Sequence, residues 1–470
     1  MTECTQESFD FPACKRRQVE ARFDGGDITS DGGVLLLQQA DRRLGLSAAV
    51  AKALDDPRRR ASCAHGLDSL IRQRLFGLAL GYEDLNDHDV LRQDPLLALL
   101  SDVADPTGQD RRRAQDKGCA LAGKSTLNRL ELTPLDGDAS SRYKKVVADP
   151  MAMDALLVDL FVEAYDEPPQ EIILDVDATD DPLHGHQEGR FFHGYYRSYC
   201  YLPLYIFCGE QLLCARLRTA NQDQSAGTVD ELERIIACIR SSWPRTRIIV
   251  RADSGFCRDD LMSWCEAHDV DYVLGLAKNN RLKAAIRSEM AEAEQHYEAT
   301  QQAARVFKDF RYRTLKSWSC ERRVVAKAEH LAKGENPRFV VTSLSTEKWP
   351  ARALYEELYC ARGDMENRIK EQQLALFADR TSTHEMRSNQ LRLYFSSFAY
   401  VLMQTLRRLG LEGTALARAQ CDTIRLKLFK IGAHIRISVR RVVMAFSESY
   451  PYTELFQHIL HKLQRIPLRC

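Results

Sequence analysis

The sequence predicts a mixed α/β protein in which helical regions flank a central part that contains a sheet. Two apolar runs rich in β-branched residues, Glu171–Asp177 and Thr246–Asp253, are typical of buried strands. A third segment, Ala351–Leu376, has strong helix composition and no internal proline. Because each of these segments also carries carboxylates, we expect the sheet and the last helix to build the functional site together.

Length and composition indicate a soluble globular protein with more than one domain. A chain of 470 residues is too long for one simple core. Lys+Arg and Asp+Glu balance at 66 each, but from Met386 to the end 14 Lys and Arg face 4 acidic residues. Residues 1–17 lack the apolar core of a signal peptide, and no stretch reaches the roughly 18 apolar residues of a membrane span. We therefore expect no membrane association.

The N-terminal third is predicted to be helical. Residues 1–26 are expected to form a loose leader and residues 27–165 a helical domain, with Leu70–Leu80 as its clearest helix. Two basic turns, Asp56–Arg60 and Arg111–Arg113, suit contact with the DNA backbone, although solvated loops are the commoner explanation.

Gly118–Ser125 matches the phosphate-binding pattern G-x-x-x-x-G-K-[ST] letter for letter. A functional loop of this kind follows a buried strand, and the preceding residues Gly108–Lys117 are almost entirely polar. A helix capped by Ser125 or Thr126 explains the segment without a nucleotide. We expect no nucleotide to bind.

The central part predicts a ribonuclease-H-like domain made of residues 166–281 and 346–385. After the first strand come two strand-like runs, a helix, a second buried strand and a further short strand: Tyr199–Cys208, Gln211–Thr219, Val229–Ser241, Thr246–Asp253 and Tyr272–Ala277. In this order the carboxylates at the ends of the first and fourth strands become neighbours. Residues 282–345 read as a partly β insertion before the last catalytic helix, and residues 386–470 as a basic helical C-terminal region.

The candidate catalytic carboxylates are Asp177, Asp253 and Glu366. Clustered carboxylates repel one another unless a cation neutralises them, although a solvated loop after a strand is the alternative. Within the last helix, Tyr359, Arg362 and Glu366 are three and four residues apart, which places them on one helical face. An ion pair between Arg362 and Glu366 on a solvated helix is the alternative there.

Together these motifs resemble the DDE transposases of bacterial insertion sequences, in the group with a Y-x2-R-x3-E-x6-K signature. Tyr359, Arg362 and Glu366 match the signature, but Gln373 stands at the lysine position, with Lys370 as the candidate substitute. Asp177-Ala-Thr and Asp253-Ser-Gly-Phe also match, and the first of these favours Asp177 over Asp175. The segment His184–Tyr196 is similar to the insertion-sequence family numbered 1380. The resemblance extends from about Phe23 to Leu463.

The resemblance implies a function and its partners. Asp177, Asp253 and Glu366 would hold two Mg2+ ions, with Mn2+ able to substitute, and Tyr359, Arg362 and Lys370 would bind DNA phosphate. The implied enzyme cleaves double-stranded DNA at the terminal inverted repeats of its element and joins the ends to target DNA. A homodimer on DNA and a cytoplasmic, nucleoid-associated location in a bacterium follow from the same resemblance. A metal-dependent nuclease of this fold without strand transfer, or a catalytically silent DNA-binding relative, are the alternatives.

Trp318 is the only tryptophan in the β-like part of the insertion. By the same resemblance it would be a candidate to stack on a flipped base of a DNA hairpin. A position in the protein core is the alternative interpretation.

Overall fold

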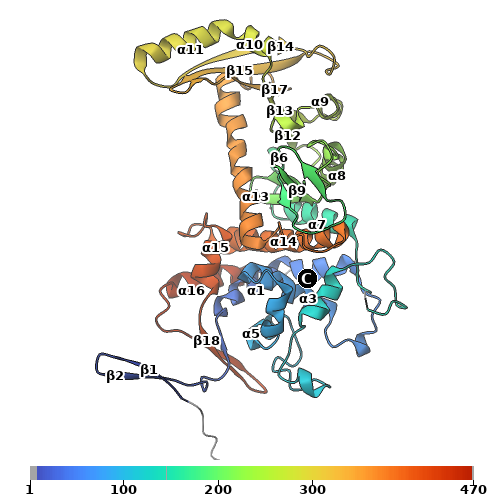
Figure 1. Cartoon of the computed structure of the whole chain (residues 1–470), viewed down its shortest axis with the longest axis vertical. Helices are drawn as coiled ribbons and strands as arrows, with labels where there is room; N and C mark the ends of the chain where they lie inside the picture. The colour runs from blue at the N-terminus through green and yellow to red at the C-terminus, as the bar shows by residue number, and fades with distance from the viewer. Residues whose placement is uncertain (1–7, 144, 468–470) are drawn as a thin grey trace, which may run out of the picture. The chain divides into compact units, whose positions relative to one another are not determined.

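The computed structural model describes residues 8–143 and 145–467 and divides into two compact units (Figure 1). The first unit takes its residues from 1–148, 375–377 and 398–470, and the second comprises 149–374 and 378–397. The boundaries of these units differ from those of the predicted domains, because the two ends of the chain belong to the same unit. None of the described helices is long and apolar enough to cross a membrane.

The second unit is built on a nine-stranded sheet with the order β11-β10-β6-β12-β13-β17-β15-β14, in which β16 pairs with β15. Its first five strands are β6 (Glu171–Ala178), β10 (Leu204–Cys208), β11 (Gln211–Arg216), β12 (Arg247–Ala252) and β13 (Asp271–Leu276). β10 pairs antiparallel with both β6 and β11, whereas β12 runs parallel to both β6 and β13. The sequence predicted that the first and fourth of these strands, β6 and β12, would be neighbours, and they are.

Three helices and a small sheet complete the central part of this unit. They are α7 (Pro150–Val162), α8 (Thr228–Ser242), α9 (Asp259–Ala267), β7 (Asp181–Pro182), β8 (Phe191–His193) and β9 (Ser198–Tyr201). Apolar residues of α8 at helical spacing, among them Leu232, Ile235 and Ile239, are fully buried in the core beside the sheet. The predicted run Tyr199–Cys208 thus divides into β9 and β10.

The insertion continues the central sheet. It consists of α10 (Asn280–Ala285), α11 (Arg287–Thr300), β14 (Ala304–Tyr312), β15 (Arg322–Leu331), β16 (Gly334–Glu335) and β17 (Arg338–Thr342). Because β17 pairs antiparallel with β13, the insertion strands extend the central sheet beyond β13.

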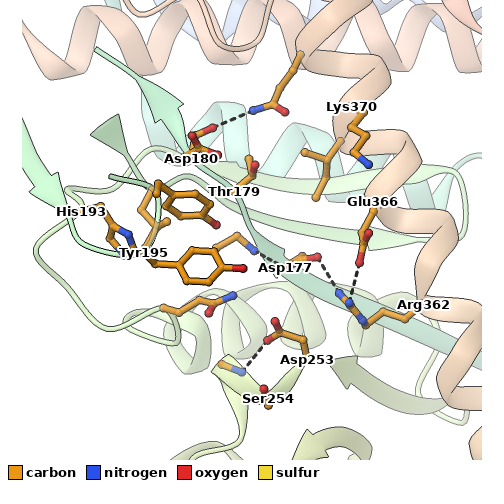
Figure 2. A pocket seen from close by; sticks show the side chains of 17 residues that line it. Asp177, Thr179, Asp180, His193, Tyr195, Asp253, Ser254, Arg362, Glu366 and Lys370 are labelled. Carbon is orange, nitrogen blue, oxygen red and sulfur yellow. Dashed lines mark hydrogen bonds and ion pairs between the residues drawn. The ribbon is translucent and has the colours of Figure 1, made fainter. Parts of the chain in front are cut away.

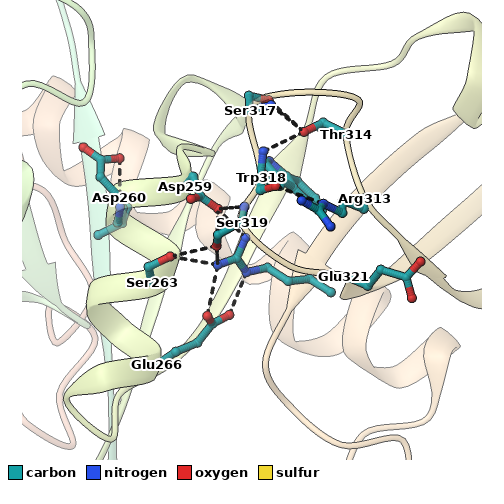
Figure 3. Close-up of polar contacts among 12 residues, drawn as sticks. Asp259, Asp260, Ser263, Glu266, Arg313, Thr314, Ser317, Trp318, Ser319 and Glu321 are labelled. Carbon is teal, nitrogen blue, oxygen red and sulfur yellow. Dashed lines mark hydrogen bonds and ion pairs between the residues drawn. The ribbon is translucent and has the colours of Figure 1, made fainter.

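Trp318 is a core residue. Only 4% of it is exposed, and its ring packs edge-on against Tyr312 at 5.7 Å. Arg322 closes this cluster by pairing with Asp259 at 2.6 Å and Glu266 at 2.7 Å (Figure 3). Trp318 therefore presents no free ring face to DNA in this structure.

The predicted helix Ala351–Leu376 is not one regular helix, which corrects the sequence interpretation. It begins as α12 (Ala351–Ala353), widens to a π-helical turn η6 (Leu354–Tyr359), tightens to a 3-10 turn η7 (Cys360–Arg362) and continues as α13 (Gly363–Leu376). The guanidinium of Arg251 donates to the carbonyl of Leu358, and a side chain that enters the helical hydrogen-bond ladder distorts it.

The first unit is mainly helical. Its helices and turns are η1 (Gly32–Val34), α1 (Leu35–Leu44), α2 (Leu46–Lys52), η2 (Arg60–Ser62), α3 (Leu67–Leu80), η3 (Leu85–Asp87), α4 (His88–Leu91), α5 (Pro95–Leu100), η4 (Ala114–Asp116), α6 (Lys124–Glu131), η8 (Arg407–Leu411), α15 (Cys421–Ile424), η9 (Arg425–Phe429) and α16 (Thr453–Arg465). A two-stranded sheet pairs β4 (Leu54–Asp55) with β5 (Val147–Ala148). Helix α14 (Met386–Leu406) contributes residues to both units.

Two predictions for the ends of the chain were wrong. Residues 9–21, expected in a loose leader, form a hairpin of β1 (Phe9–Cys14) and β2 (Arg17–Ala21). In the C-terminal region, expected to be helical throughout, β18 (Ala433–Ile437) and β19 (Val442–Phe446) pair, and β18 also pairs with β3 (Ile28–Thr29). The alternation of apolar and polar residues in 433–437 has the period of a strand, which a purely compositional reading overlooks.

The segment Gly118–Ser125, which matches the phosphate-binding pattern, contains the first residues of helix α6 (Lys124–Glu131). α6 begins directly after Gly123, so the predicted cap at Ser125 or Thr126 was wrong. Asp89 provides the cap from outside the segment, since its Oδ1 accepts the backbone N–H of Lys124 at 2.9 Å. The Lys124 ammonium pairs with Asp89 at 3.3 Å, and the element before α6 is a 3-10 turn. The strand that a nucleotide site of this kind needs does not precede it in the described chain.

Candidate active site

Three carboxylates from three separate segments line one pocket of about 940 Å³ in the second unit (Figure 2). Asp177 lies in β6, Asp253 directly follows β12, and Glu366 belongs to α13. β6 and β12 are parallel neighbours whose register pairs Val176 with Ala252. Both aspartates therefore lie at the carboxyl ends of these two parallel strands, on the same side of the sheet.

Asp177 is the most buried of the three carboxylates, with 12% of its side chain exposed. Burial raises its pKa to about 6; Arg362 opposes that rise, and the negative charge of Asp253 adds to it. Its Oδ1 accepts the backbone N–H of Ala178 at 2.9 Å. A carboxylate in this state binds a cation readily, because a cation offsets the cost of its buried charge.

Asp253 is fixed by its own turn. Its Oδ1 accepts the backbone N–H of Gly255 at 2.7 Å, which caps the short turn η5 (Ser254–Phe256). Gly255 packs closely against Gln224. A Cβ added at position 255 would lie only 2.0 Å from Gln224 Oε1, so a larger residue does not fit there. The carboxylate is thus held by backbone geometry at the strand end.

Arg362 lies between Asp177 and Glu366 and pairs with both. Its Nη1 is 2.8 Å from Asp177 Oδ2, and its Nη2 is 2.7 Å from Glu366 Oε1. The ion pair with Glu366, which was the alternative interpretation of this spacing, is therefore present, but the guanidinium also reaches across to Asp177 in the sheet. It neutralises two of the three carboxylates from a part-buried position.

The other predicted phosphate-binding residues occupy different positions. Lys370 is exposed and lines the pocket, whereas Gln373, at the lysine position of the signature, donates to the backbone carbonyl of Asp180 at 3.2 Å. Tyr359 is outside the set of pocket-lining residues and half-buried. Its hydroxyl lies over Gly275, where a Cβ would approach it to 2.5 Å.

Asp175 is separated from the pocket by a buried ion pair. Arg251 donates from Nε to Asp175 Oδ1 at 2.5 Å and from Nη2 to Oδ2 at 2.8 Å. Both residues are less than a tenth exposed. Asp175 is thereby occupied, which agrees with the preference for Asp177 as a candidate ligand.

The donors of the pocket suit a hard divalent cation, whereas their present arrangement does not form a finished metal centre. Carboxylate oxygens are the ligands that Mg2+ and Mn2+ prefer. In the described chain, no three His, Cys, Asp or Glu side chains are grouped closely enough to hold a metal ion. Arg362 provides the positive charge between two of the carboxylates, so a cation would have to displace it.

Sequence reasoning missed one wall of the pocket. His193, Tyr195 and Tyr196, from β8 and the turn that follows it, line the pocket, and Figure 2 shows His193 and Tyr195 on the side opposite Glu366 and Lys370. The aromatic-rich run Phe191–Tyr199 is the signal that could have indicated them, because exposed aromatic residues beside basic ones are typical of nucleic-acid surfaces.

Comparison with known proteins identifies the family. The model of the family described as "Transposase DDE domain group 1" matches residues 11–468. The chain belongs to this family. DDE transposases are phosphoryl-transfer enzymes that generally use divalent metal ions, which agrees with the broader part of the sequence prediction. The narrower similarity to the insertion-sequence family numbered 1380 stays a prediction.

Among solved structures, the chain is similar to a piggyBac transposase seen by cryo-electron microscopy in a synaptic complex with hairpin DNA. The TM-score is 0.39 at 10% sequence identity, and the match covers 93% of this chain and 82% of that one. No curated protein matches the sequence.

Proposed function

We propose that this DDE-family protein is the transposase of an insertion sequence, which binds the terminal inverted repeats, cleaves DNA and transfers the ends to target DNA. The observation that carries the proposal is the convergence of Asp177, Asp253 and Glu366 on one pocket of a chain in this family. On DNA the protein acts as a homodimer, because two element ends must be cut and joined together.

The carboxylates of Asp177, Asp253 and Glu366 would hold two Mg2+ ions, which supply Lewis-acid stabilisation of the attacking and leaving oxygens. Asp177, as the most buried of the three, is the candidate to bridge the ions. Its raised pKa makes it sensitive to the charge placed beside it.

Arg362 and Lys370 have a second role when DNA arrives. The planar guanidinium that holds Asp177 and Glu366 is also suited to bidentate contact with a phosphate. Lys370 places an exposed positive charge on the same pocket wall. Moving Arg362 from carboxylates to phosphate would free the acidic ligands and bind the substrate in one exchange.

The chemistry comprises two displacements at phosphorus. Water attacks the phosphodiester at the element end and breaks the bond to the 3′ oxygen, which leaves as a 3′-hydroxyl. That hydroxyl then attacks a target phosphodiester in the same pocket and displaces another 3′ oxygen. Both steps need the same carboxylates, so one set of substitutions should affect both.

The test is an assay with labelled element ends, a supercoiled target plasmid and Mg2+. Asp177→Asn, Asp253→Asn and Glu366→Gln should each lower cleavage and joining by about a thousandfold or more, as expected for groups that act as a unit. Asp364→Asn, an exposed acidic position two residues from Glu366, is the matched control and should retain activity. Chelation of the divalent ion should abolish both products.

The outcomes separate the alternatives. Cleavage without joining by the unaltered protein would indicate a nuclease, and DNA binding without cleavage would indicate a silent relative. Full activity in the three carboxylate variants would show that the site is elsewhere.

A further inference from the structure

The β8–β9 hairpin carries an exposed aromatic surface beside the catalytic pocket. Four of its side chains are unusually exposed for aromatic residues: Phe191 by 41%, Phe192 by 56%, Tyr195 by 84% and Tyr199 by 44%. Soluble proteins seldom expose so many aromatic side chains in one short segment without a binding role.

Hydrogen bonds to residues 384–386 hold the base of this hairpin, whereas Tyr195 near its tip is exposed. The backbone N–H of Glu188 donates to the carbonyl of His384 at 2.8 Å, and the N–H of Met386 donates to a Glu188 carboxylate oxygen at 3.0 Å. At the tip, Arg197 turns the chain with a positive φ of 55° and returns its N–H to the carbonyl of His193 at 2.8 Å. The hairpin therefore presents the tip side chains from a fixed support.

The hairpin itself carries basic side chains, although the pocket that it borders also contains Asp177 and Asp180. From Arg190 to Cys208 the sequence contains no acidic residue. The Arg190 guanidinium lies 3.6 Å from the centre of the Tyr199 ring, a cation–π contact that keeps a positive charge on the hairpin surface. A positively charged surface with aromatic rings attracts a polyanion that also has flat apolar faces, and single-stranded nucleic acid has both properties.

Tyr195 is the residue of this surface that reaches the pocket with a free ring. It lines the pocket wall opposite Glu366 and Lys370 (Figure 2). Its neighbour Tyr196 lies at right angles to it at 5.0 Å, and because 84% of Tyr195 is exposed, at least one face of its ring is uncovered. In contrast, Tyr196 itself is partly packed against His193 at 4.9 Å.

We propose that Tyr195 stacks on an unpaired base of the DNA strand whose phosphate lies in the catalytic pocket. It is a positioning residue: by holding the base next to the scissile phosphate, it aligns that phosphate with the three carboxylates. Only a base outside the double helix offers a free face, so the contact distinguishes frayed or single-stranded ends from intact duplex. The inference rests on the proposed function, since it needs DNA in the pocket.

The test compares two DNA probes in the absence of divalent metal, so that the probe stays uncut. One is a duplex with blunt ends, and the other is the same duplex with a short single-stranded overhang that contains the fluorescent adenine analogue aminopurine. Stacking on one aromatic ring should make the overhang probe bind at least about fivefold more tightly. Binding should also change the aminopurine fluorescence.

Substitutions then assign this preference to the ring. Tyr195→Ala should remove the preference for the overhang and the fluorescence change, whereas Tyr195→Phe, which keeps the ring, should retain both. Because Tyr195 is 84% exposed, neither change should affect folding. Tyr143→Ala, at a 55% exposed tyrosine of the first unit, is the matched control and should behave like the unaltered protein.

Several results would overturn the inference. They are an unaltered overhang preference in Tyr195→Ala, an equal loss in Tyr195→Ala and Tyr195→Phe, and an equal loss of affinity for both probes. If the unaltered protein binds both probes equally, the stacking proposal fails while the proposed function stands. If it binds neither probe, the proposed function itself fails.

Discussion

At the scale of single residues, the contact between Tyr359 and Gly275 links the π-helical turn to the strand β13 beside the candidate active site. A Cβ at Gly275 would lie 2.5 Å from the Tyr359 hydroxyl and 2.8 Å from the backbone nitrogen of Ser254. Real Cβ atoms do not approach other atoms so closely, so a side chain here must displace either the phenol or the backbone that carries Asp253. Glycine is therefore needed at this position for space.

We expect Gly275→Ala to lower DNA cleavage at least about tenfold and to destabilise the fold by about 1–3 kcal/mol, as overpacking usually does. Adding Tyr359→Phe removes one of the two clashing atoms and should recover part of the stability. Gly432→Ala, where no atom lies within 4 Å of the added Cβ, is the control and should be neutral. Thermal unfolding and the cleavage assay measure both effects, and a neutral Gly275→Ala would contradict the steric argument.

His88 provides a prediction about pH. It is fully buried, its Nδ1 lies 3.0 Å from the amide nitrogen of Gln73, and burial lowers its pKa to about 3 from an ordinary 6.5. Since the unfolded chain takes up this proton more readily, the stabilising contribution is complete above about pH 6.5 and decreases as the pH falls toward 3.

We therefore expect His88→Gln to flatten the dependence of the free energy of unfolding on pH between about 6.5 and 3, by an amount on the order of a few kcal/mol. Denaturant unfolding at a series of pH values would measure it. His458→Gln, at an exposed histidine, should leave the slope unchanged. An equal slope in His88→Gln and the unaltered protein would show that other groups control acid unfolding.

At the scale of elements, the pair Asp175–Arg251 joins β6 and β12, and the same guanidinium donates to the Leu358 carbonyl in η6. Removing one partner would leave an uncompensated charge in the interior. We expect Asp175→Ala to destabilise the second unit by about 3–5 kcal/mol. The double change Asp175→Leu with Arg251→Met should cost less than Asp175→Ala alone, because it buries no unpaired charge.

Calorimetric unfolding would compare these variants, with Asp364→Asn as a control at an exposed carboxylate. If Asp175→Ala unfolds at the same temperature as the unaltered protein, the pair contributes nothing to stability. A double variant less stable than the single one would contradict the charge argument.

The same elements show what the sequence could and could not predict. β6, β12 and β13 were recognisable because buried parallel strands are continuous apolar runs of short length. The convergence of Asp177 and Asp253 followed from strand order alone. The π-helical turn was not predictable, since it depends on Arg251, more than a hundred residues away, reaching the Leu358 carbonyl. The pairing of Arg362 with Asp177 likewise joins residues 185 positions apart.

At the scale of the whole molecule, the first unit is assembled from distant parts of the chain. The Lys430 ammonium pairs with Asp31 at 2.6 Å, and Arg425 donates to the carbonyl of Ala79 at 2.8 Å. Local patterns identify helices in both segments but carry no information about such long-range partners. For this reason most of the predicted N-terminal domain and most of the predicted C-terminal region are parts of one unit.

Two basic loops of this unit lie side by side because Arg111 connects them. Its Nη1 donates to the carbonyl of Ala64, four residues after Arg60, at 2.8 Å, while its Nε donates to the carbonyl of Cys119 in its own segment at 3.0 Å. The loops expose four further arginines, Arg59, Arg60, Arg112 and Arg113. Within the proposed function, we expect this surface to bind the DNA backbone and to contribute affinity without reading sequence.

We therefore expect simultaneous Ala substitution of the four exposed arginines to weaken DNA binding and to lower the slope of log K against log salt by up to about 3.6, since each phosphate contact contributes about 0.9. The matched control replaces Lys15, Arg16, Arg17 and Arg22 of the exposed β1–β2 region, which removes the same charge from the same unit. Fluorescence anisotropy over a series of salt concentrations would measure both slopes. Equal slopes in the two variants would mean that net charge, rather than this surface, determines binding. Because the three candidate catalytic carboxylates are unchanged, the loop variant should still cleave DNA at low salt, where the lost phosphate contacts matter least.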